Sequence, residues 1–313
     1  MSQTQPTQMS EEDYLRKHLE KAESKSKQPI FEPIAKQKDS SRTTDLQYQA
    51  FDVSLFPCGM FYPLGSTIQV RGALVKEIQA YSMVDDNNFV DIIDKMNDML
   101  MSCVRIKYNN AENTIGTYLD IREQDRIYLL FLIREITFQQ GMYLTVNKEC
   151  TCKNDVQIEL KPSNFTYFEL NPKIAKYFDN YNKCFTFDYN GQEFNLTMPC
   201  IGLQKSFTEY ITEEVTQKKN PNLSFLKIMP FLLGNRNNMS TKEIKEELKK
   251  FQSLSIDTFQ FLNSAIAYMK FGIESLRKSC GVCGQEVRTE MTFPNGASGI
   301  FVVYDAFDRY FQE

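Results

Sequence analysis

Two pairs of cysteines are the residues of this sequence whose types and spacing could do chemistry. Cys150 and Cys152 flank a threonine, and Cys280 and Cys283 belong to a Cys-Gly-Val-Cys-Gly segment. Thiolates are the ligands that zinc prefers in structural sites, and a closed shell of four sulfurs leaves no position for water or a substrate. We therefore predict that these four cysteines bind one structural zinc ion.

The two pairs are distant in the sequence, with 127 residues between Cys152 and Cys280. A shared ion thus requires two remote turns to meet, and its binding energy would become folding energy. Glycines suit the second turn because they accept positive φ angles. The first pair has one intervening residue instead of the usual two, which holds its sulfurs more rigidly. The alternative is that these are four of eight ordinary cysteines, buried as small hydrophobic residues.

The composition is that of a folded, mildly acidic protein. The chain has 313 residues, 42 % of them hydrophobic and 24 % charged, enough for one large domain or two lobes. A net charge of −4 gives no general attraction to phosphate backbones, so we expect no nucleic-acid binding. The longest apolar run, 127–133, is too short to cross a bilayer, so we expect no membrane span. Eight cysteines and the lack of an apolar leader in 1–39 indicate synthesis in a reducing cytoplasm.

The sequence contains a single histidine, His18, in a polar stretch near the N-terminus. Histidine performs most acid–base catalysis near neutral pH, so its absence elsewhere excludes catalytic triads, Cys–His dyads and histidine-bound catalytic metals. No pair of carboxylates is placed in a way that argues for catalysis. We therefore predict that the protein is not an enzyme.

Residues 1–45 are rich in Gln, Ser, Lys and Thr and predict an extended N-terminal arm. Within the arm, residues 10–13 resemble a capping box, and Tyr14, Leu15, His18 and Leu19 follow at helical spacing, which predicts one short helix. Such a helix is marginal in water on its own. Two hypotheses stay open: the arm lies on a partner subunit, or it packs on its own domain.

Residues 46–313 predict an α+β body of mixed helices and antiparallel hairpins. Alternating residues predict strands at 67–71, 142–146, 156–160 and 286–291, and Asn190-Gly191 predicts a type I′ hairpin between 184–189 and 192–196. The first cysteine pair would lie at a hairpin tip. We therefore expect a discontinuous zinc-ribbon-like site, with metal-binding turns (knuckles) at 142–160 and 276–292.

The predicted helices are recognised by apolar stripes and caps. One stripe runs from Phe89 to Val104, and a further helix, capped by Asp120, ends near Gly141. In that helix, helix capping is the expected role of the acids in the first turn, Glu123 and Asp125. Other helices are expected at 75–84, from residue 206 onward, at 225–233 with an interruption at Pro230, and at 240–251. A last helix is expected to be capped by Asp257 and to lead to the second cysteine pair.

The order of several short motifs resembles a known family. The matching segments cover most of the chain, and they are 56–63, 70–71, 91–93, 124–127, 132–134, 141–143, the first cysteine pair, 196–199 and 280–284. Together they resemble the baseplate proteins of T-even-type contractile-tailed phages, including the baseplate hub subunit and hub-assembly group. The sequence departs from the family pattern at Cys150-Thr151-Cys152, where a Cys-x-x-Cys pair is expected, and in its long N-terminal arm.

The resemblance implies a non-catalytic structural or assembly component of a phage tail baseplate, near the hub. Its partners would be other baseplate or tail proteins, with the N-terminal arm as a contact and an oligomeric context. It would act in the virion after synthesis in the host cytoplasm, as a permanent component or as an assembly factor. The alternative is a zinc-ribbon nucleic-acid-binding or regulatory protein. That function requires basic residues near the cysteines, where the sequence offers Lys153, Arg277 and Lys278.

Overall fold

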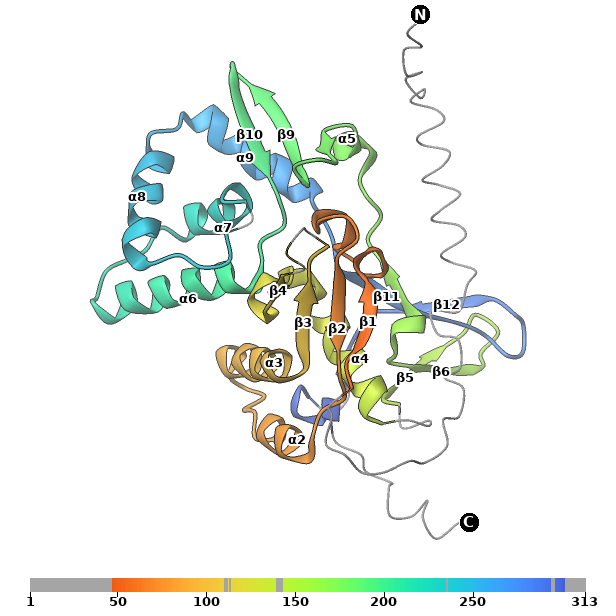
Figure 1. The fold of residues 1–313 in the computed structure, drawn as a ribbon. Helices are drawn as coiled ribbons and strands as arrows, with labels where there is room; N and C mark the ends of the chain where they lie inside the picture. The colour runs from red at the N-terminus through yellow and green to blue at the C-terminus, as the bar shows by residue number, and fades with distance from the viewer. Residues whose placement is uncertain are drawn as a thin grey trace, which may run out of the picture. The chain divides into compact units, whose positions relative to one another are not determined.

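The computed structural model describes residues 47–109, 112, 114–138, 143–234, 236–293 and 296–301. The predicted N-terminal arm, the predicted helix end at Gly141 and the aromatic residues after Phe301 lie outside these ranges. The described chain is an α+β fold of eight α-helices and four antiparallel sheets (Figure 1). The predicted fold class is therefore confirmed.

The first sheet has the strand order β1-β2-β3-β4, and all its neighbours are antiparallel. Alternate residues of its central strands, among them Ile68 and Ile106, are fully buried. Helices α3 and α4 pack against β3 and β2 and against each other. The elements of this part are β1 (Gln49–Asp52), β2 (Thr67–Val70), α2 (Val75–Ser82), α3 (Phe89–Cys103), β3 (Val104–Lys107), β4 (Ile115–Gly116) and α4 (Arg126–Thr137).

Helix α3 confirms most of its predicted apolar stripe. Met96, Leu100 and Cys103 are buried, whereas Phe89 is 74 % exposed and Val104 belongs to the next strand. Phe89 is the first residue of the helix, after the cap Asn88, and there the apolar position faces away from the core.

The predicted cap of α4 is wrong. Asp120 ends a short 3₁₀ turn, Tyr118–Asp120, and accepts a hydrogen bond from the backbone N–H of Thr117 at 2.8 Å. A second 3₁₀ turn, Glu123–Asp125, precedes the helix, and Asp125 makes no capping hydrogen bond. Asp125 is instead fully buried and accepts hydrogen bonds from Cys58 N (2.9 Å) and the Tyr62 hydroxyl (2.7 Å).

Arg122 completes this buried polar network. Its guanidinium donates to the carbonyls of Met198 (2.7 Å) and Phe61 (2.8 Å), and its backbone N–H donates to the Tyr62 hydroxyl (2.8 Å). The network therefore joins three segments that are distant in the sequence: the turn at 56–62, the entry to α4 and the strand end near Met198.

The hairpin around Asn190-Gly191 forms as predicted. Strands β9 (Cys184–Tyr189) and β10 (Gln192–Leu196) pair in register, and the two turn residues have φ angles of 54° and 73°. Both values lie in the left-handed region that a type I′ turn requires. Phe185 and Phe187 are buried on one face, and β8 (Phe178–Asp179) joins the other edge of β9.

A helical group completes the fold, and two of its predicted details are wrong. Pro230 does not interrupt its helix: it lies inside it, where one backbone hydrogen bond is lost while Ile228 and Met229 remain buried. The last helix is capped by Ser255 rather than Asp257. The predicted capping box of Ser240 and Glu243 is confirmed. These elements are α5 (Pro172–Ala175), α6 (Ile201–Thr216), α7 (Leu223–Leu232), α8 (Thr241–Gln252) and α9 (Ile256–Tyr268).

Candidate metal centre

Two antiparallel hairpins carry the cysteine pairs. The first consists of β5 (Thr145–Glu149) and β6 (Asp155–Glu159), and the second of β11 (Ile273–Ser279) and β12 (Glu286–Thr289). Figure 1 shows both projecting to the same side of the body, and Lys278 Nζ of one donates to Gln157 O of the other at 2.8 Å. The predicted hairpin around the first pair is confirmed.

The approach to the second pair differs from the prediction. Helix α9 ends at Tyr268, and strand β11 delivers the chain to Cys280. This strand also pairs on its other edge with β7 (Phe165–Tyr167), and Leu276 within it is fully buried. The second turn is therefore supported by a three-stranded sheet anchored in the core.

The four sulfurs converge between the two hairpin tips. Cys150 Sγ lies 3.6 Å from Cys283 Sγ, and Cys152 Sγ lies 3.7 Å from Cys280 Sγ. All four sulfurs lie within 4.8 Å of one another. A tetrahedron with metal–sulfur bonds of about 2.3 Å has edges of about 3.8 Å, so the spacing fits a four-sulfur metal shell. The cysteines are free thiols, because a disulfide would require sulfurs about 2 Å apart.

The two cysteine turns are built in the same way despite their different lengths. In the first, Lys153 N donates to Cys150 O at 2.8 Å, and in the second, Gly284 N donates to Cys280 O at 2.9 Å. The residue after the second cysteine is left-handed in both, with φ of 63° at Lys153 and 73° at Gly284. Of the two glycines for which we predicted positive φ, only Gly284 has it. The Cys-x-Cys turn is thus a shorter form of the Cys-x-x-Cys turn.

The backbone around the sulfurs favours thiolates. The N–H groups of Cys283 and Val282 point at Cys280 Sγ and lower the pKa of that thiol to about 6. The N–H of Cys152 lowers the pKa of Cys150 in the same way. For Cys152 itself, the N–H of Asn154 lowers the pKa, but the neighbouring sulfurs outweigh it and the pKa is raised. Four thiolates within 4.8 Å of one another would repel each other, so a cation is needed to hold them together.

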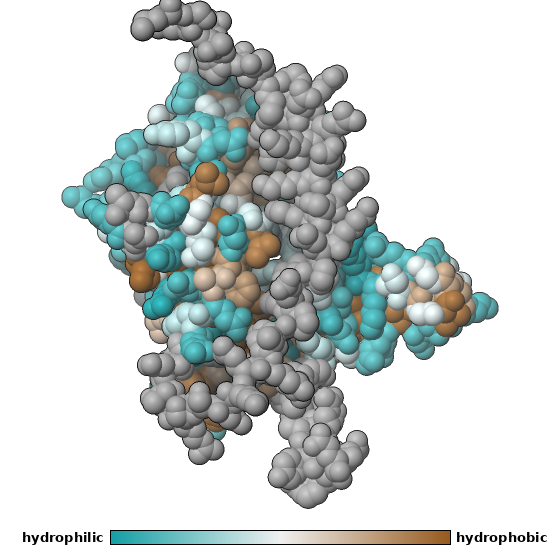
Figure 2. Space-filling model, turned by 45° about the vertical axis from the view of Figure 1, so that its right-hand side comes forward, coloured by the Kyte–Doolittle hydropathy of each residue, from teal (hydrophilic) through white to brown (hydrophobic). Residues whose placement is uncertain are grey.

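The cluster is covered on one side only. Cys150 and Cys280 are buried, whereas Cys152 and Cys283 are exposed. Val282, between the cysteines of the second turn, is 74 % exposed. Figure 2 shows hydrophobic residues among hydrophilic ones at the projecting end on its right. A metal bound here would be reachable from solvent while its shell of protein ligands stayed complete, as in structural sites.

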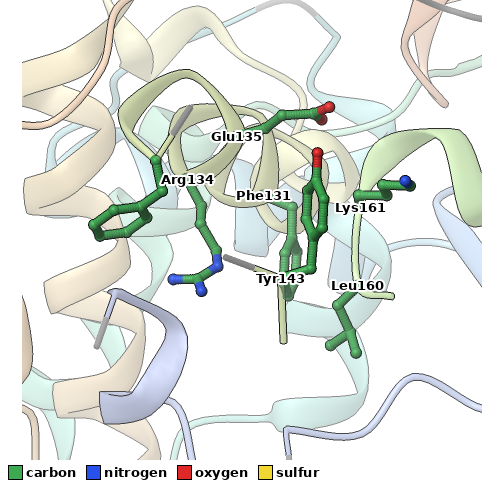
Figure 3. Close-up of a pocket in the computed structure, with 7 residues that line it drawn as sticks. Phe131, Arg134, Glu135, Tyr143, Leu160 and Lys161 are labelled. Carbon is green, nitrogen blue, oxygen red and sulfur yellow. The ribbon is translucent and has the colours of Figure 1, made fainter. Parts of the chain in front are cut away.

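Two hollows elsewhere offer less for chemistry. Figure 3 shows the first, around Phe131, where the side chains of Arg134 and Glu135 point away from each other. The Arg134 guanidinium donates a hydrogen bond to the carbonyl of Ile300. This hollow encloses no volume for a water molecule, and it is lined by Phe131, Arg134, Glu135, Phe138, Tyr143, Leu160 and Lys161. Burial raises the pKa of Glu135 and lowers that of Arg134 to about 10.

The second hollow is larger, at about 110 Å³, and lies beside the buried network of Arg122. Its polar groups already have partners: Asp120 binds Asn237 Nδ2 at 2.6 Å, and Cys200 Sγ donates to Arg236 O at 3.1 Å. Burial raises the pKa of the Cys200 thiol, which makes it a poor nucleophile. This hollow therefore has no activated group.

No protein-family model, curated protein or solved structure matches this chain. Among the described residues, every helix is too short or too polar to cross a membrane. The structure brings together all four cysteines that the sequence singled out. Sequence reasoning missed the buried network of Arg122 and Asp125, because both residues lie in a charged run that is typical of an exposed helix start.

Proposed function

We propose that this protein is a non-catalytic structural or assembly component of a contractile phage tail baseplate, in the hub region, stapled by a structural zinc ion. The observation that carries the proposal is the convergence of the four cysteine sulfurs between two hairpins. A four-sulfur shell has no open position for a substrate or an activated water, so a metal bound there would serve the fold.

The buried network joins segments on which the resemblance to the baseplate family depends. Three of the segments on which the resemblance depends, 56–63, 124–127 and 196–199, meet there through Tyr62, Asp125 and the Met198 carbonyl. Buried charged groups are costly unless every partner is in place, so a change in one segment has to be matched in the others. The resemblance thus rests on residues that depend on one another in this fold.

Zinc is the metal that fits this site best, because the ligands are four sulfurs in tetrahedral spacing. Metal analysis of the purified protein should give one zinc per chain, and Cys283→Ala should lose the metal and most of the soluble folded protein. Ser253→Ala is the control, because it makes a change of similar size to Cys283→Ala at an exposed position in another part of the chain. A Cys283→Ala protein with wild-type thermal stability would refute the structural role of zinc.

The baseplate role is tested in the phage. Deletion of the gene should give particles without functional baseplates, and mass spectrometry of purified virions then separates a permanent component from an assembly factor. The hub proposal fails if the deletion mutant makes infectious particles with normal tails. This result would leave the metal experiment unaffected, so the two parts of the proposal can fail independently.

A zinc-ribbon nucleic-acid-binding protein is the second candidate, because two cysteine hairpins that face each other are the core of such ribbons. The charges beside the cysteines weigh against it. Arg277 and Arg288 both face Glu286, at 3.8 Å and 2.7 Å, which reduces the positive charge available to a phosphate backbone. Tight binding of generic DNA or RNA in a gel-shift assay at low salt would favour this candidate.

A further inference from the structure

The outer side of helix α3 has a stripe of residues that face solvent. Met96, Met99, Leu100 and Cys103 point into the core. The opposite side has four residues spaced four, four and three residues apart, so they form one line along the helix: Val90, Asp94, Asp98 and Met101. We call these four residues the outer face of α3. Figure 1 shows α3 beside β3, at the edge of the body away from the cysteine hairpins.

The ends of the outer face are apolar. Val90 is 55 % exposed and Met101 is 58 % exposed. Single exposed apolar side chains are common on protein surfaces, but Val90 and Met101 lie on one line of the helix with two carboxylates between them.

The middle of the outer face is acidic, and its charges have no cationic partner among the described residues. No described lysine or arginine lies within 4.0 Å of a carboxylate of Asp91, Asp94 or Asp98, including Lys95 on the same helix. Carboxylates one turn apart repel each other, and a cationic partner would relieve this repulsion.

We infer that the outer face of α3 binds a helix of another protein that has an apolar side chain at each end of its contact face and lysine or arginine between them. Charge argues against the chain's own C-terminal residues 302–313 as the occupant, because Asp305, Asp308 and Glu313 outnumber Arg309 there. The inference depends on α3 alone and holds whether or not the cysteines bind zinc. It adds a contact site to the proposed role as an assembly component.

The test uses the full chain and a fluorescein-labelled, alanine-based helical peptide with leucine at each end of one face and lysine between the leucines. Fluorescence anisotropy should show saturable binding, which Asp94→Lys/Asp98→Lys weakens roughly tenfold or more. The matched control, Asp188→Lys/Glu246→Lys, makes the same change of net charge at exposed positions on other elements and should bind like the wild type. Val90→Ser/Met101→Ser should also weaken binding, because the ends of the face contribute by apolar contact.

Three results would overturn the inference. Equal loss of binding in the matched control would show attraction to net charge only, and unchanged binding in Asp94→Lys/Asp98→Lys would place the peptide elsewhere. Sedimentation velocity adds a third readout: wild-type dimers that dissociate on the same double substitution would make a second copy, not a foreign helix, the occupant. Circular dichroism of each variant checks that α3 remains folded.

Discussion

The buried carboxylate of Asp125 makes a prediction about stability and pH that can be worked out from the structure. Burial raises the pKa of Asp125 to about 6, although hydrogen bonds from Tyr62 and from Cys58 N oppose the shift. The unfolded chain has a pKa of about 3.9 at such a residue, so the difference is about 2 units, or ~3 kcal/mol. The folded state therefore binds this proton more tightly than the unfolded state does.

The sign follows from that difference. The stabilisation that the folded state gains from binding the Asp125 proton more tightly is complete below pH ~4 and is lost as the pH rises through ~6. Asp125→Asn removes the titrating group, so the wild type should lose about 3 kcal/mol relative to this variant between pH 4 and pH 7.5. Urea unfolding followed by circular dichroism at several pH values measures both proteins, and the titration of all other groups, the cysteines included, cancels in the difference.

Asp188→Asn, which removes one carboxylate at an exposed position, is the matched control. A difference between wild type and Asp125→Asn that is flat, or that grows in favour of the wild type as the pH rises, would contradict the reasoning. In that case the two hydrogen bonds would outweigh burial, and Asp125 would be ionised in the fold at all of these pH values.

Three other predictions concern the cysteine turns and the helical group. Lys153→Gly should stabilise the protein by about 1 kcal/mol in thermal unfolding, because glycine adopts the left-handed φ of 63° without strain. An unchanged or lower stability of this variant would refute the prediction. Hydrogen peroxide added to the zinc-bound protein should release the metal and form the disulfides Cys150–Cys283 and Cys152–Cys280, because these sulfurs are only 3.6 and 3.7 Å apart. Each disulfide gives two electrons to one peroxide, which is reduced to two waters. Peptide mapping that finds disulfides within each turn instead would refute the pairing. Gly202→Ala should lower the free energy of unfolding in urea by about 3 kcal/mol, because the added Cβ would collide with the carbonyl of Asn237. Gly281→Ala is the control and should be neutral, because its Cβ would enter open space. Equal stability of the two variants would contradict the close packing at Gly202.

Several elements could be predicted from the sequence because their causes are local. Asn190-Gly191 determines its hairpin through two left-handed residues, and Ser240 with Glu243 determines the start of α8 through reciprocal hydrogen bonds. Each of these interactions spans only a few residues, so the pattern can be recognised without knowing the rest of the fold. The cap of α9 was misplaced because Ser255 and Asp257 are both good cap residues and lie close together.

The sequence by itself determined which cysteines could bind a metal, because residue type and turn chemistry are local properties. Only the tertiary structure decided that the two turns meet, since the strand pairing of β11 with β7 and the packing of the hairpins bring Cys280 to Cys152 across 127 residues. The tertiary structure likewise decided that Asp125 is buried rather than a helix cap. Burial depends on what packs around a residue, and the turn at Cys58 and Tyr62 that covers Asp125 comes from a segment more than 60 residues away.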